Sequence, residues 1–315
     1  MAASISVIIP TMNRPDSLER TLRHIAEGTV KPQQIVIVDQ SQDDNICLRN
    51  RNILNAFSDY IEVLSYVFQK TPSLTKARNA GVLHAENEIL IFADDDIDVE
   101  TDTIANVAEI MRDSQIAMIA GIDKLTHNSS SNIGYLLGTK SFLNRRIGHV
   151  TYSMLGRYPD NITGQVETQW AQGYFFVVRK SLLKKWNCQW DENLTSYAYA
   201  EDLDFSYMYY KSAKAEGLKC VLDSRVSVNH LATLEYRIPN EKNLYMYIIN
   251  RAYLSHKHHM GTVGRIASAW CNFWRLIEQI VGRQQAYTFA RAWLKSIVHR
   301  KEIIAGNLDY NKFMK

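Results

Sequence analysis

Three consecutive aspartates, Asp94, Asp95 and Asp96, directly follow the apolar segment EILIFA at 88–93. Carboxylates are hard oxygen ligands of the kind that Mg²⁺ and Mn²⁺ take in proteins. Alternate carboxylates of the triplet can therefore divide the work, one binding a cation while another reaches a hydroxyl or a cation-bound water. The alternative is a solvated acidic turn that caps the following helix. The position of the triplet at the end of a buried strand favours a functional site.

A second acidic pair, Glu201 and Asp202, lies in the segment YAYAEDLDF. The pattern predicts a helix that begins at this pair, so the helix dipole lowers the carboxylate pKa values while the aromatic neighbours raise them. A carboxylate in such a place is a candidate general base. The alternative is the acidic charge that is common in the first turn of a helix.

Three further polar residues are candidates for the same site, and each also has an ordinary explanation. Asp39 ends the segment QIVIVD, where its carboxylate could accept the N3–H of a uracil ring; the alternative is a turn aspartate. Arg78, in KARNAG, could contact phosphate or sugar oxygens and is otherwise a surface arginine. His230, at the end of SVNH, could be a metal ligand, although an isolated histidine is more often a core or surface residue. The HKHH segment at 256–259 is interpreted as a cationic helix face and not as a metal cluster.

The apolar pattern supplies the elements that would bring these residues together. We predict strand 5–10, helix 17–26, strand 34–39, helix 46–57, strand 62–68, helix 74–83 and strand 88–93. This alternation indicates a parallel sheet covered by helices on both faces. In such sheets a ligand binds at the carboxyl ends of the strands, so Thr11, Asp39 and Asp94 should meet in one crevice.

The rest of the chain divides into an irregular segment and a helical tail. We predict a strand at 116–120, long excursions over 123–167, a strand at 170–179, a helix at 201–215, strand material at 219–222 and 227–230, and helices from 240 onward. The expected organisation is a first half at 1–122, a second half of the same domain at 123–239, and a helical extension at 240–315.

The composition is that of an ordinary globular chain, 46% hydrophobic and 22% charged in 315 residues. A net charge of +3 is too small to indicate a nucleic-acid-binding protein. The charge is uneven, since 12 of the 36 Lys and Arg but 3 of the 33 Asp and Glu fall within 242–315, giving this tail +9 and the remainder −6. Such a basic tail is typical of a segment that binds a surface or a partner.

The sequence also bears on the cellular compartment. The four cysteines show no CxxC spacing, which indicates thiols of a reducing environment. No apolar stretch approaches the length of a membrane-spanning helix, and residues 1–10 lack the basic flank of a secretory signal. We therefore expect a cytoplasmic protein, with peripheral contact at the inner face of the membrane left open.

Several segments, in their order along residues 4–233, resemble the family 2 glycosyltransferases of the GT-A fold. They are SVIIPTMNRPDSLERTL, VDQSQDD, LTKARNAGVLHAENEILIFADDDIDV, GYFFVVRKSLL, DENLTSYAYAEDLDFSYMYYKSA and the closing VNH. The resemblance implies an α/β GT-A fold, with a Rossmann-like, mostly parallel central sheet flanked by helices and a helical C-terminal extension. Gln40 and Gln42 stand where the family has an aspartate and a glycine.

The resemblance further implies inverting transfer of a sugar from a nucleotide-sugar, expected to be UDP-linked, to a hydroxyl of a glycan or lipid-linked acceptor in polysaccharide or glycoconjugate biosynthesis. It implies Mn²⁺ or Mg²⁺ as cofactor, held by Asp96 and His230, and Asp202 as the general base supported by Glu201. The nucleotide-sugar would be bound by Pro10, Thr11, Arg14, Asp39, Gln40, Arg78, Asp94 and Asp95. The donor sugar or acceptor would be bordered by Trp170, Gly173 and Tyr174.

The tail lies outside this resemblance. Its apolar residues follow helical spacing, with arginines nearby: Ile266, Trp270, Phe273, Trp274, Ile277 and Ile280. Such a helix could lie on an anionic membrane surface, where a lipid-linked acceptor would be found. The alternative, favoured because tryptophan-rich stripes more often fill cores, is packing against the body or against a second subunit through 262–300.

Other functions are weighed against this one. A catalytically inactive nucleotide-sugar-binding or scaffold protein would have no need for the general base Asp202. A sugar-nucleotide nucleotidyltransferase would need a glycine-rich, basic phosphate loop after the first strand, and TMNRPD at 11–16 is not one. A dehydrogenase is disfavoured because no GxGxxG follows Pro10.

Overall fold

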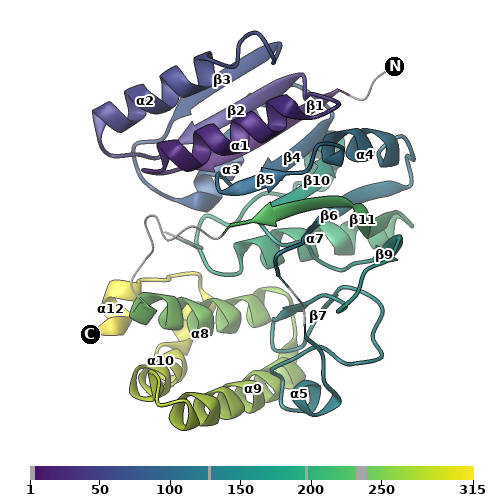
Figure 1. The fold of residues 1–315 in the computed structure, drawn as a ribbon. Helices are drawn as coiled ribbons and strands as arrows, with labels where there is room; N and C mark the ends of the chain where they lie inside the picture. The colour runs from purple at the N-terminus through teal and green to yellow at the C-terminus, as the bar shows by residue number, and fades with distance from the viewer. Residues whose placement is uncertain (1–3, 127–128, 196–197, 232–239) are drawn as a thin grey trace.

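One mixed β-sheet forms the centre of the protein, as a computed structural model shows for residues 4–126, 129–195, 198–231 and 240–315 (Figure 1). Its strands are β1 (Ile5–Thr11), β2 (Gln34–Asp39), β3 (Val63–Phe68), β4 (Ile89–Ala93), β5 (Ile97–Val99), β6 (Ile116–Asp123), β9 (Gln165–Glu167), β10 (Phe175–Arg179) and β11 (Lys219–His230). The order across the sheet is β3-β2-β1-β4-β10-β6-β11-β5, and β9 pairs with β11. The first four strands in this order are parallel, whereas β10 runs antiparallel to both its neighbours.

Both faces of the sheet are covered, as the unbroken apolar strands predict. Along β1 the side chains alternate, so that Ile5, Val7 and Ile9 enter one apolar cluster and Ile8 enters the other. The helices α1 (Pro15–Glu27), α2 (Asp44–Asn55) and α4 (Thr103–Ile110) supply the first cluster. The helices α3 (Leu74–His84), α6 (Lys180–Lys185), α7 (Glu201–Ala215) and α8 (Asn240–Lys257) supply the second. The predicted helices and strands of the first half are therefore confirmed.

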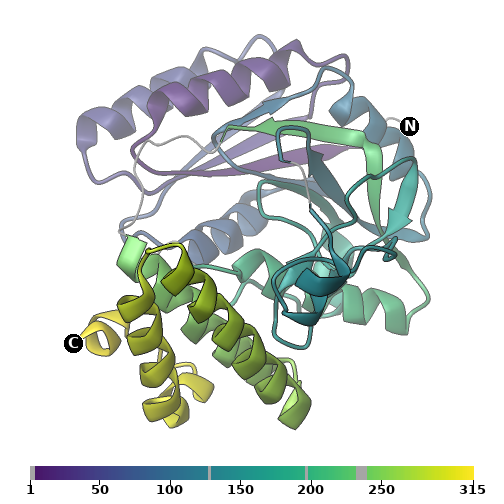
Figure 2. The same cartoon turned by 60° about the horizontal axis from the view of Figure 1, so that its bottom comes forward.

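The C-terminal helices gather on the side of the molecule away from β1 to β3 (Figures 1 and 2). They are α8, α9 (Gly261–Val281), α10 (Ala286–Val298), α11 (Arg300–Ile304) and α12 (Tyr310–Met314). Helix α8 joins them to the body because its buried Tyr245, Met246 and Ile249 belong to the second apolar cluster. Helix α8 therefore packs on the body, whereas the apolar stripe of α9 keeps Ile266, Trp270, Phe273 and Ile280 exposed, so its packing on the body or on a second subunit stays a prediction.

Helix α9 also contacts the irregular segment of the second half. This segment contains the short elements α5 (Asn132–Leu136), β7 (His149–Val150) and β8 (Gly156–Arg157). Trp270 donates from Nε1 to the Leu136 carbonyl oxygen at 2.6 Å. The outer side of α9 nevertheless keeps large apolar side chains exposed, among them Ile266 at 66% and Val281 at 78%. None of the helices in the described ranges is both long enough and apolar enough to span a bilayer.

The structure differs from the expected elements at three places near the site. The predicted strand 170–179 begins only at Phe175, so residues 170–174 are free to line a cleft. Strand β5 follows the acidic triplet and α4 begins only at Thr103, so the triplet does not cap a helix. The strand material at 219–222 and 227–230 forms one strand, β11, whose register shifts between Leu222 and Ser227.

The close contact between α3 and β1 gives a test of the core. A Cβ on Gly81 would lie 2.2 Å from Cγ2 of Ile8, far inside contact distance. Alanine in a helix interior stabilises the helix by about 1 kcal/mol relative to glycine. Overpacking a core, however, typically lowers the free energy of unfolding by about 1–3 kcal/mol. We expect Gly81→Ala to lower the free energy of unfolding in a urea titration, against its helix propensity. An equal or higher value would show that β1 and α3 move apart without cost.

Candidate active site

A cleft of about 790 Å³ opens at the carboxyl ends of β1 and β4 and is bounded on its other side by the start of α7. With the exception of Asp39, every site residue predicted from the sequence lines it: Pro10, Thr11, Arg14, Gln40, Arg78, Asp94, Asp95, Asp96, Trp170, Gly173, Tyr174, Glu201, Asp202 and His230. Residues as far apart along the chain as 10 and 230 thus meet in one cavity, as the strand-end rule predicts.

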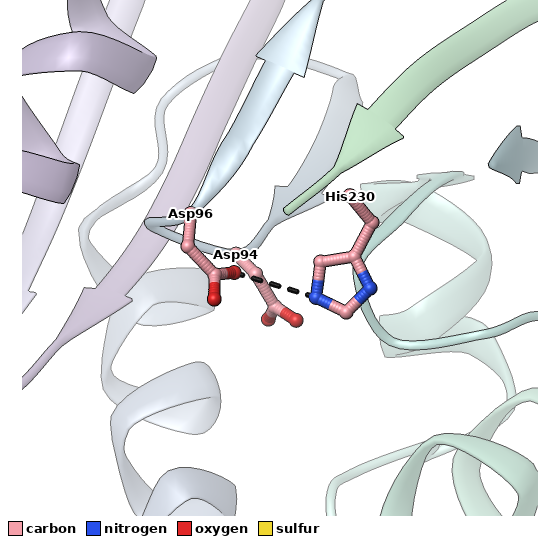
Figure 3. A group of neighbouring side chains, drawn as sticks. All are labelled: Asp94, Asp96 and His230. Carbon is pink, nitrogen blue, oxygen red and sulfur yellow. Dashed lines mark ion pairs between the residues drawn. The ribbon is translucent and has the colours of Figure 1, made fainter. Parts of the chain in front are cut away.

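Asp94, Asp96 and His230 form a group that could hold a metal ion (Figure 3). One ligand atom from each lies within 4.8 Å of the others, and His230 Nε2 is 3.4 Å from Asp96 Oδ1. The sheet explains the meeting, because β11 runs antiparallel to β5 with His230 paired to Ile97, directly after Asp96. The two carboxylates are ligands of the kind that Mn²⁺ and Mg²⁺ take, and the imidazole adds a nitrogen ligand.

The imidazole of His230 is held in place by neighbours that the sequence analysis did not assign this role. Its ring stacks on Tyr174 with centroids 5.3 Å apart, and its backbone N–H donates to Asp123 Oδ1 at 3.0 Å. The Tyr174 hydroxyl in turn donates to the Gly121 carbonyl and accepts from the Asp123 N–H. Burial lowers the pKa of His230, but the hydrogen bond to Asp96 and the charges of Asp94 and Asp96 outweigh it and raise the pKa overall.

The middle member of the triplet points the other way. Asp95 accepts a hydrogen bond from Thr11 Oγ1 at 2.6 Å and pairs with Arg14 Nη1 at 3.2 Å. It is 4% exposed, and burial raises its pKa to about 7 despite these partners. Asp95 therefore connects the triplet to the loop after β1, while Asp94 and Asp96 face His230.

Arg78 connects the triplet to the second acidic pair. Its guanidinium is 1% exposed and donates from Nη1 to Glu201 Oε1 at 2.6 Å. Its Nη2 donates to Asp94 Oδ1 at 3.2 Å and to the Gly173 carbonyl at 3.1 Å, and the group lies over the Trp190 ring. Arg78 thus lines the cleft while its guanidinium bonds to the protein itself, and its contact with a ligand stays a prediction.

The start of α7 presents Asp202 to the cleft. Ala200, the residue before the helix, has a φ of 66°, a left-handed conformation that is uncommon for alanine. Asp202 accepts from the Gly173 N–H at 2.9 Å and the Leu203 N–H at 2.7 Å, which fixes both oxygens. Burial raises the pKa of Asp202. Burial and the charge of Asp202 raise the pKa of Glu201 to about 8, with Arg78 opposing the shift.

Of the two predicted nucleotide-binding residues at the end of β2, Gln40 lines the cleft and Asp39 does not. Asp39 is fully buried and accepts hydrogen bonds from the Ser41 N–H, from Asn50 and from the Tyr66 hydroxyl, at 2.8, 2.9 and 2.6 Å. It therefore shapes the loop after β2 and does not line the cleft. Gln40, the residue that follows β2, lines the cleft instead.

The wall opposite the triplet comes from the irregular segment, as the predicted excursions over the site imply. Residues 154–157 line the cleft and pack against Trp170, whose Nε1 donates to the Arg157 carbonyl at 3.2 Å. A Cβ on Gly156 would lie 2.3 Å from the Trp170 ring, so glycine permits this contact. No sequence motif distinguishes these wall residues, and the sequence analysis did not identify them.

Solved structures with the same architecture define the fold. The mannosyltransferase PcManGT from Pyrobaculum calidifontis, solved with GDP-Man and Mn²⁺, is 15% identical with a TM-score of 0.56, covering all of this chain and 85% of that chain. S. aureus TarS 1-349 is 16% identical with a TM-score of 0.53, covering 99% of this chain and 89% of that chain. The mixed sheet, its helices and the helical C-terminal region are thus those of a GT-A glycosyltransferase, as predicted.

The sequence itself places the chain in a family. The profile of glycosyl transferase family 2 matches residues 6–186, more than half of the chain, and the chain belongs to that family. Among curated proteins, validoxylamine A glucosyltransferase of Streptomyces hygroscopicus subsp. limoneus is 34% identical over 92 residues, 29% of this chain and 20% of that protein. Glycosyltransferase GlyA of Streptococcus pneumoniae serotype 4 is 26% identical over 131 residues, 42% of this chain and 18% of that protein. The matched region thus spans about a fifth of the length of these relatives.

The metal group gives a prediction that needs no substrate. We expect Asp96→Ala and His230→Ala each to weaken Mn²⁺ binding at least about 10²-fold, since even residues that only support a ligand typically contribute 10–100-fold. Titration of Mn²⁺ by calorimetry would measure this. Asp98→Ala is the matched control, because Asp98 lies in β5 beside the triplet but pairs with Arg20 and His24. Equal losses in all three variants would contradict the assignment.

Proposed function

We propose that this family 2 glycosyltransferase transfers a sugar from a UDP-linked donor to an acceptor hydroxyl by direct, inverting displacement. The observation that carries the proposal is the bridge made by Arg78, which joins Asp94 on one side of the cleft to Glu201 on the other. It keeps a candidate metal group and a candidate base facing one cavity. A donor bound at the first and an acceptor near the second would then meet between them.

The cofactor of the proposal is Mn²⁺ or Mg²⁺, held by Asp94, Asp96 and His230. When bound, the ion neutralises the charge that the diphosphate gains as it leaves. The metal in the PcManGT structure, and that in a structure of GalNAc-T7 with UDP, GalNAc and Mn²⁺, is consistent with this choice. Arg78, fixed by Glu201 and Gly173, would orient Asp94 for this role.

Asp202 is proposed as the general base that takes the proton of the acceptor hydroxyl. A carboxylate is a better proton acceptor when its pKa is raised, and burial raises that of Asp202. The N–H groups of Gly173 and Leu203 hold its two oxygens. In an inactive scaffold protein, the competing hypothesis, this buried acidic pair would be an unused cost to stability.

Gln40 is proposed to contact the nucleobase in place of Asp39. Its Oε1 accepts from the Ser73 N–H at 2.7 Å and from Gln69 Nε2 at 3.2 Å. A backbone N–H can only donate, so the amide NH₂ of Gln40 is the part left for a ligand. It would donate to a carbonyl oxygen of a pyrimidine, whereas a carboxylate would accept its N3–H. TarS 1-349 has been solved in complex with UDP-GlcNAc, which is consistent with a uridine donor.

The acceptor would enter along the wall formed by residues 154–157 and Trp170. This wall lies between the cleft and the C-terminal helices, because Arg251 of α8 donates from Nε to the Ser153 carbonyl at 2.8 Å. A glycan or lipid-linked acceptor of polysaccharide or glycoconjugate biosynthesis suits an open cleft of this kind. We place the enzyme in the cytoplasm, with the basic C-terminal helices as the part that would meet the inner face of the membrane or a second copy.

Replacing the base tests the proposed mechanism. We expect Asp202→Asn to bind UDP and Mn²⁺ as the native chain does but to hydrolyse or transfer from a UDP-sugar at least about 10²-fold more slowly. Glu216→Gln, at the exposed end of the same helix, should keep the native rate.

The pH profile adds a second measurement of the same residue. Because the base must be deprotonated, the native rate should fall as the pH decreases through the pKa of Asp202, which lies above that of an ordinary aspartate. The acid limb should be absent from the residual activity of Asp202→Asn. Native turnover in that variant would show that another group takes the proton.

The donor polarity of Gln40 is tested by a nearly isosteric change to glutamate. A carboxylate at this position could still accept from the Ser73 N–H but would turn a second acceptor toward the base. We expect Gln40→Glu to weaken UDP binding about tenfold, the usual size of one lost hydrogen bond with a buried group left unpaired. Calorimetry with Mn²⁺ present measures this, and Gln42→Glu adds the same charge nearby as a control. Tighter UDP binding in Gln40→Glu would mean that the base offers its N3–H at this place.

A further inference from the structure

A second cavity, of about 550 Å³, lies among α8, α9, α10 and α11. It shares no lining residue with the proposed active-site cleft and lies outside residues 6–186. Its floor is buried and includes Arg251, Asn272 and Ile303, whereas Ile297 at its edge is 61% exposed. The cavity is therefore open to solvent and reaches down to a buried guanidinium.

The lining of this cavity carries one sign of charge. Arg251, Arg265, Arg300, His256 and His259 all line it, and none of the lining residues in the described part of the chain is acidic. Glu302, the acidic residue that follows Arg300 most closely, is engaged by Lys312 and His299. A cavity with this lining attracts an anion.

Two polar atoms of the lining residues are buried without a hydrogen-bond partner. They are Nη2 of Arg251 and Oγ of Ser268, which have no nitrogen or oxygen partner among the described residues; the Cys271 thiol, a weak acceptor, is the group that interacts with the Arg251 guanidinium on this side. The other donors of Arg251 are used, Nε by the Ser153 carbonyl at 2.8 Å and Nη1 by Asn272 Oδ1 at 3.0 Å. The side chain of Arg251 is 1% exposed. An unpaired guanidinium N–H at such depth is costly, and an anionic oxygen would satisfy it.

The remaining lining residues are apolar. Ile248, Ala252 and Ile303 lie toward the floor, and Trp293 and Ile297 lie on the α10 side. Val298 and Leu294, also of α10, are 67% and 60% exposed. An aliphatic chain could follow this surface out of the cavity, since burial of its methylenes would be favourable.

The geometry points to a binding site for a phosphate monoester of an aliphatic alcohol, with the phosphate beside Arg251 and the chain against Trp293 and Ile297. Phosphate supplies oxygens for the unpaired guanidinium N–H and for the arginines and histidines of the rim. The site is separate from the transfer reaction of the proposed function. Arg251 links it to the cleft, since its bond to the Ser153 carbonyl reaches the residue before the cleft wall.

Calorimetric titration with octyl phosphate tests this site. We expect saturable, one-to-one binding to the full chain, much tighter than that of inorganic phosphate, because each buried methylene adds about a factor of four. Ala269 is an exposed residue of the lining, so Ala269→Trp should fill part of the cavity. We expect it to weaken the binding of octyl phosphate at least about tenfold, because the tryptophan would displace two or more methylenes.

Charge variants separate this site from general attraction to a basic surface. Arg265 and Arg300 are exposed residues of the lining. The double variant Arg265→Ala, Arg300→Ala should weaken the binding of octyl phosphate about tenfold, the effect of losing one charge-assisted contact. Arg283→Ala with Lys301→Ala removes the same charge from the same region outside the cavity and should leave binding unchanged. UDP binding with Mn²⁺ should stay native in all of these variants, which shows that they fold and that the active-site cleft is independent.

Three results would overturn the inference: no saturable binding of octyl phosphate, equal affinity for inorganic phosphate, or native affinity in Ala269→Trp. Flotation with phosphatidylcholine vesicles, with and without phosphatidic acid, whose phosphate is a monoester, then identifies the source of the phosphate. Flotation that needs the anionic lipid and is lost in Ala269→Trp identifies a membrane lipid headgroup. Binding of octyl phosphate without flotation identifies a free phosphate ester.

Discussion

A single buried guanidinium, that of Arg78, holds together the two halves of the active-site cleft. The first half presents Asp94 at the end of β4, and the second presents Glu201 at the start of α7; Arg78 binds both. A charge this deeply buried is tolerated only with partners of opposite charge and satisfied hydrogen bonds. The carboxylates meet the first need, and the Gly173 carbonyl and the Trp190 ring meet part of the second, since Nε of Arg78 is buried without a hydrogen-bond partner among the described residues. The cost of separating these groups is what keeps the cleft in one geometry.

The sheet then determines which residues reach that cleft. Parallel strands deliver Thr11 and Asp94 to the same edge, and the antiparallel pairing of β11 with β5 returns His230 to the triplet from over a hundred residues away. The triplet lies in the turn between β4 and β5, where Asp95 bonds Thr11 and Arg14, while Asp94 and Asp96 face His230 and Asp96 also pairs with Arg14. The candidate metal group thus depends on this turn and on the pairing of β11 with β5, which places His230 opposite Ile97.

The sequence predicts those parts of the site that depend on local patterns. Strand ends and the acidic triplet are local, so the fold class, the cleft and its lining residues are predictable from the order of apolar runs and carboxylates. The partner of a buried charge can lie far away in the sequence. Nothing in KARNAG indicates that Arg78 binds Glu201, 123 residues later, instead of a ligand. Asp39 and Gln40 show the same limit, because which of two adjacent residues faces the cleft depends on the end of β2 and on donors from Asn50 and Tyr66. The wall at residues 154–157 has no periodicity, so only the packing against Trp170 defines it.

Two arginines of this chain are buried to the same degree, and the difference between their surroundings is informative. Arg78 and Arg251 are each 1% exposed. Arg78 is paired with two carboxylates, so its charge is compensated within the protein and its role is to position them. Arg251 has a carbonyl and an amide as its hydrogen-bond acceptors and forms no ion pair with any acidic residue in the described ranges. Its aromatic contact with Tyr247 offsets part of the cost of burial, but a full counter-charge is missing. A buried cation beside an open cavity is stabilised by an anion that enters that cavity, which is the physical basis of the anion site proposed for the C-terminal helices.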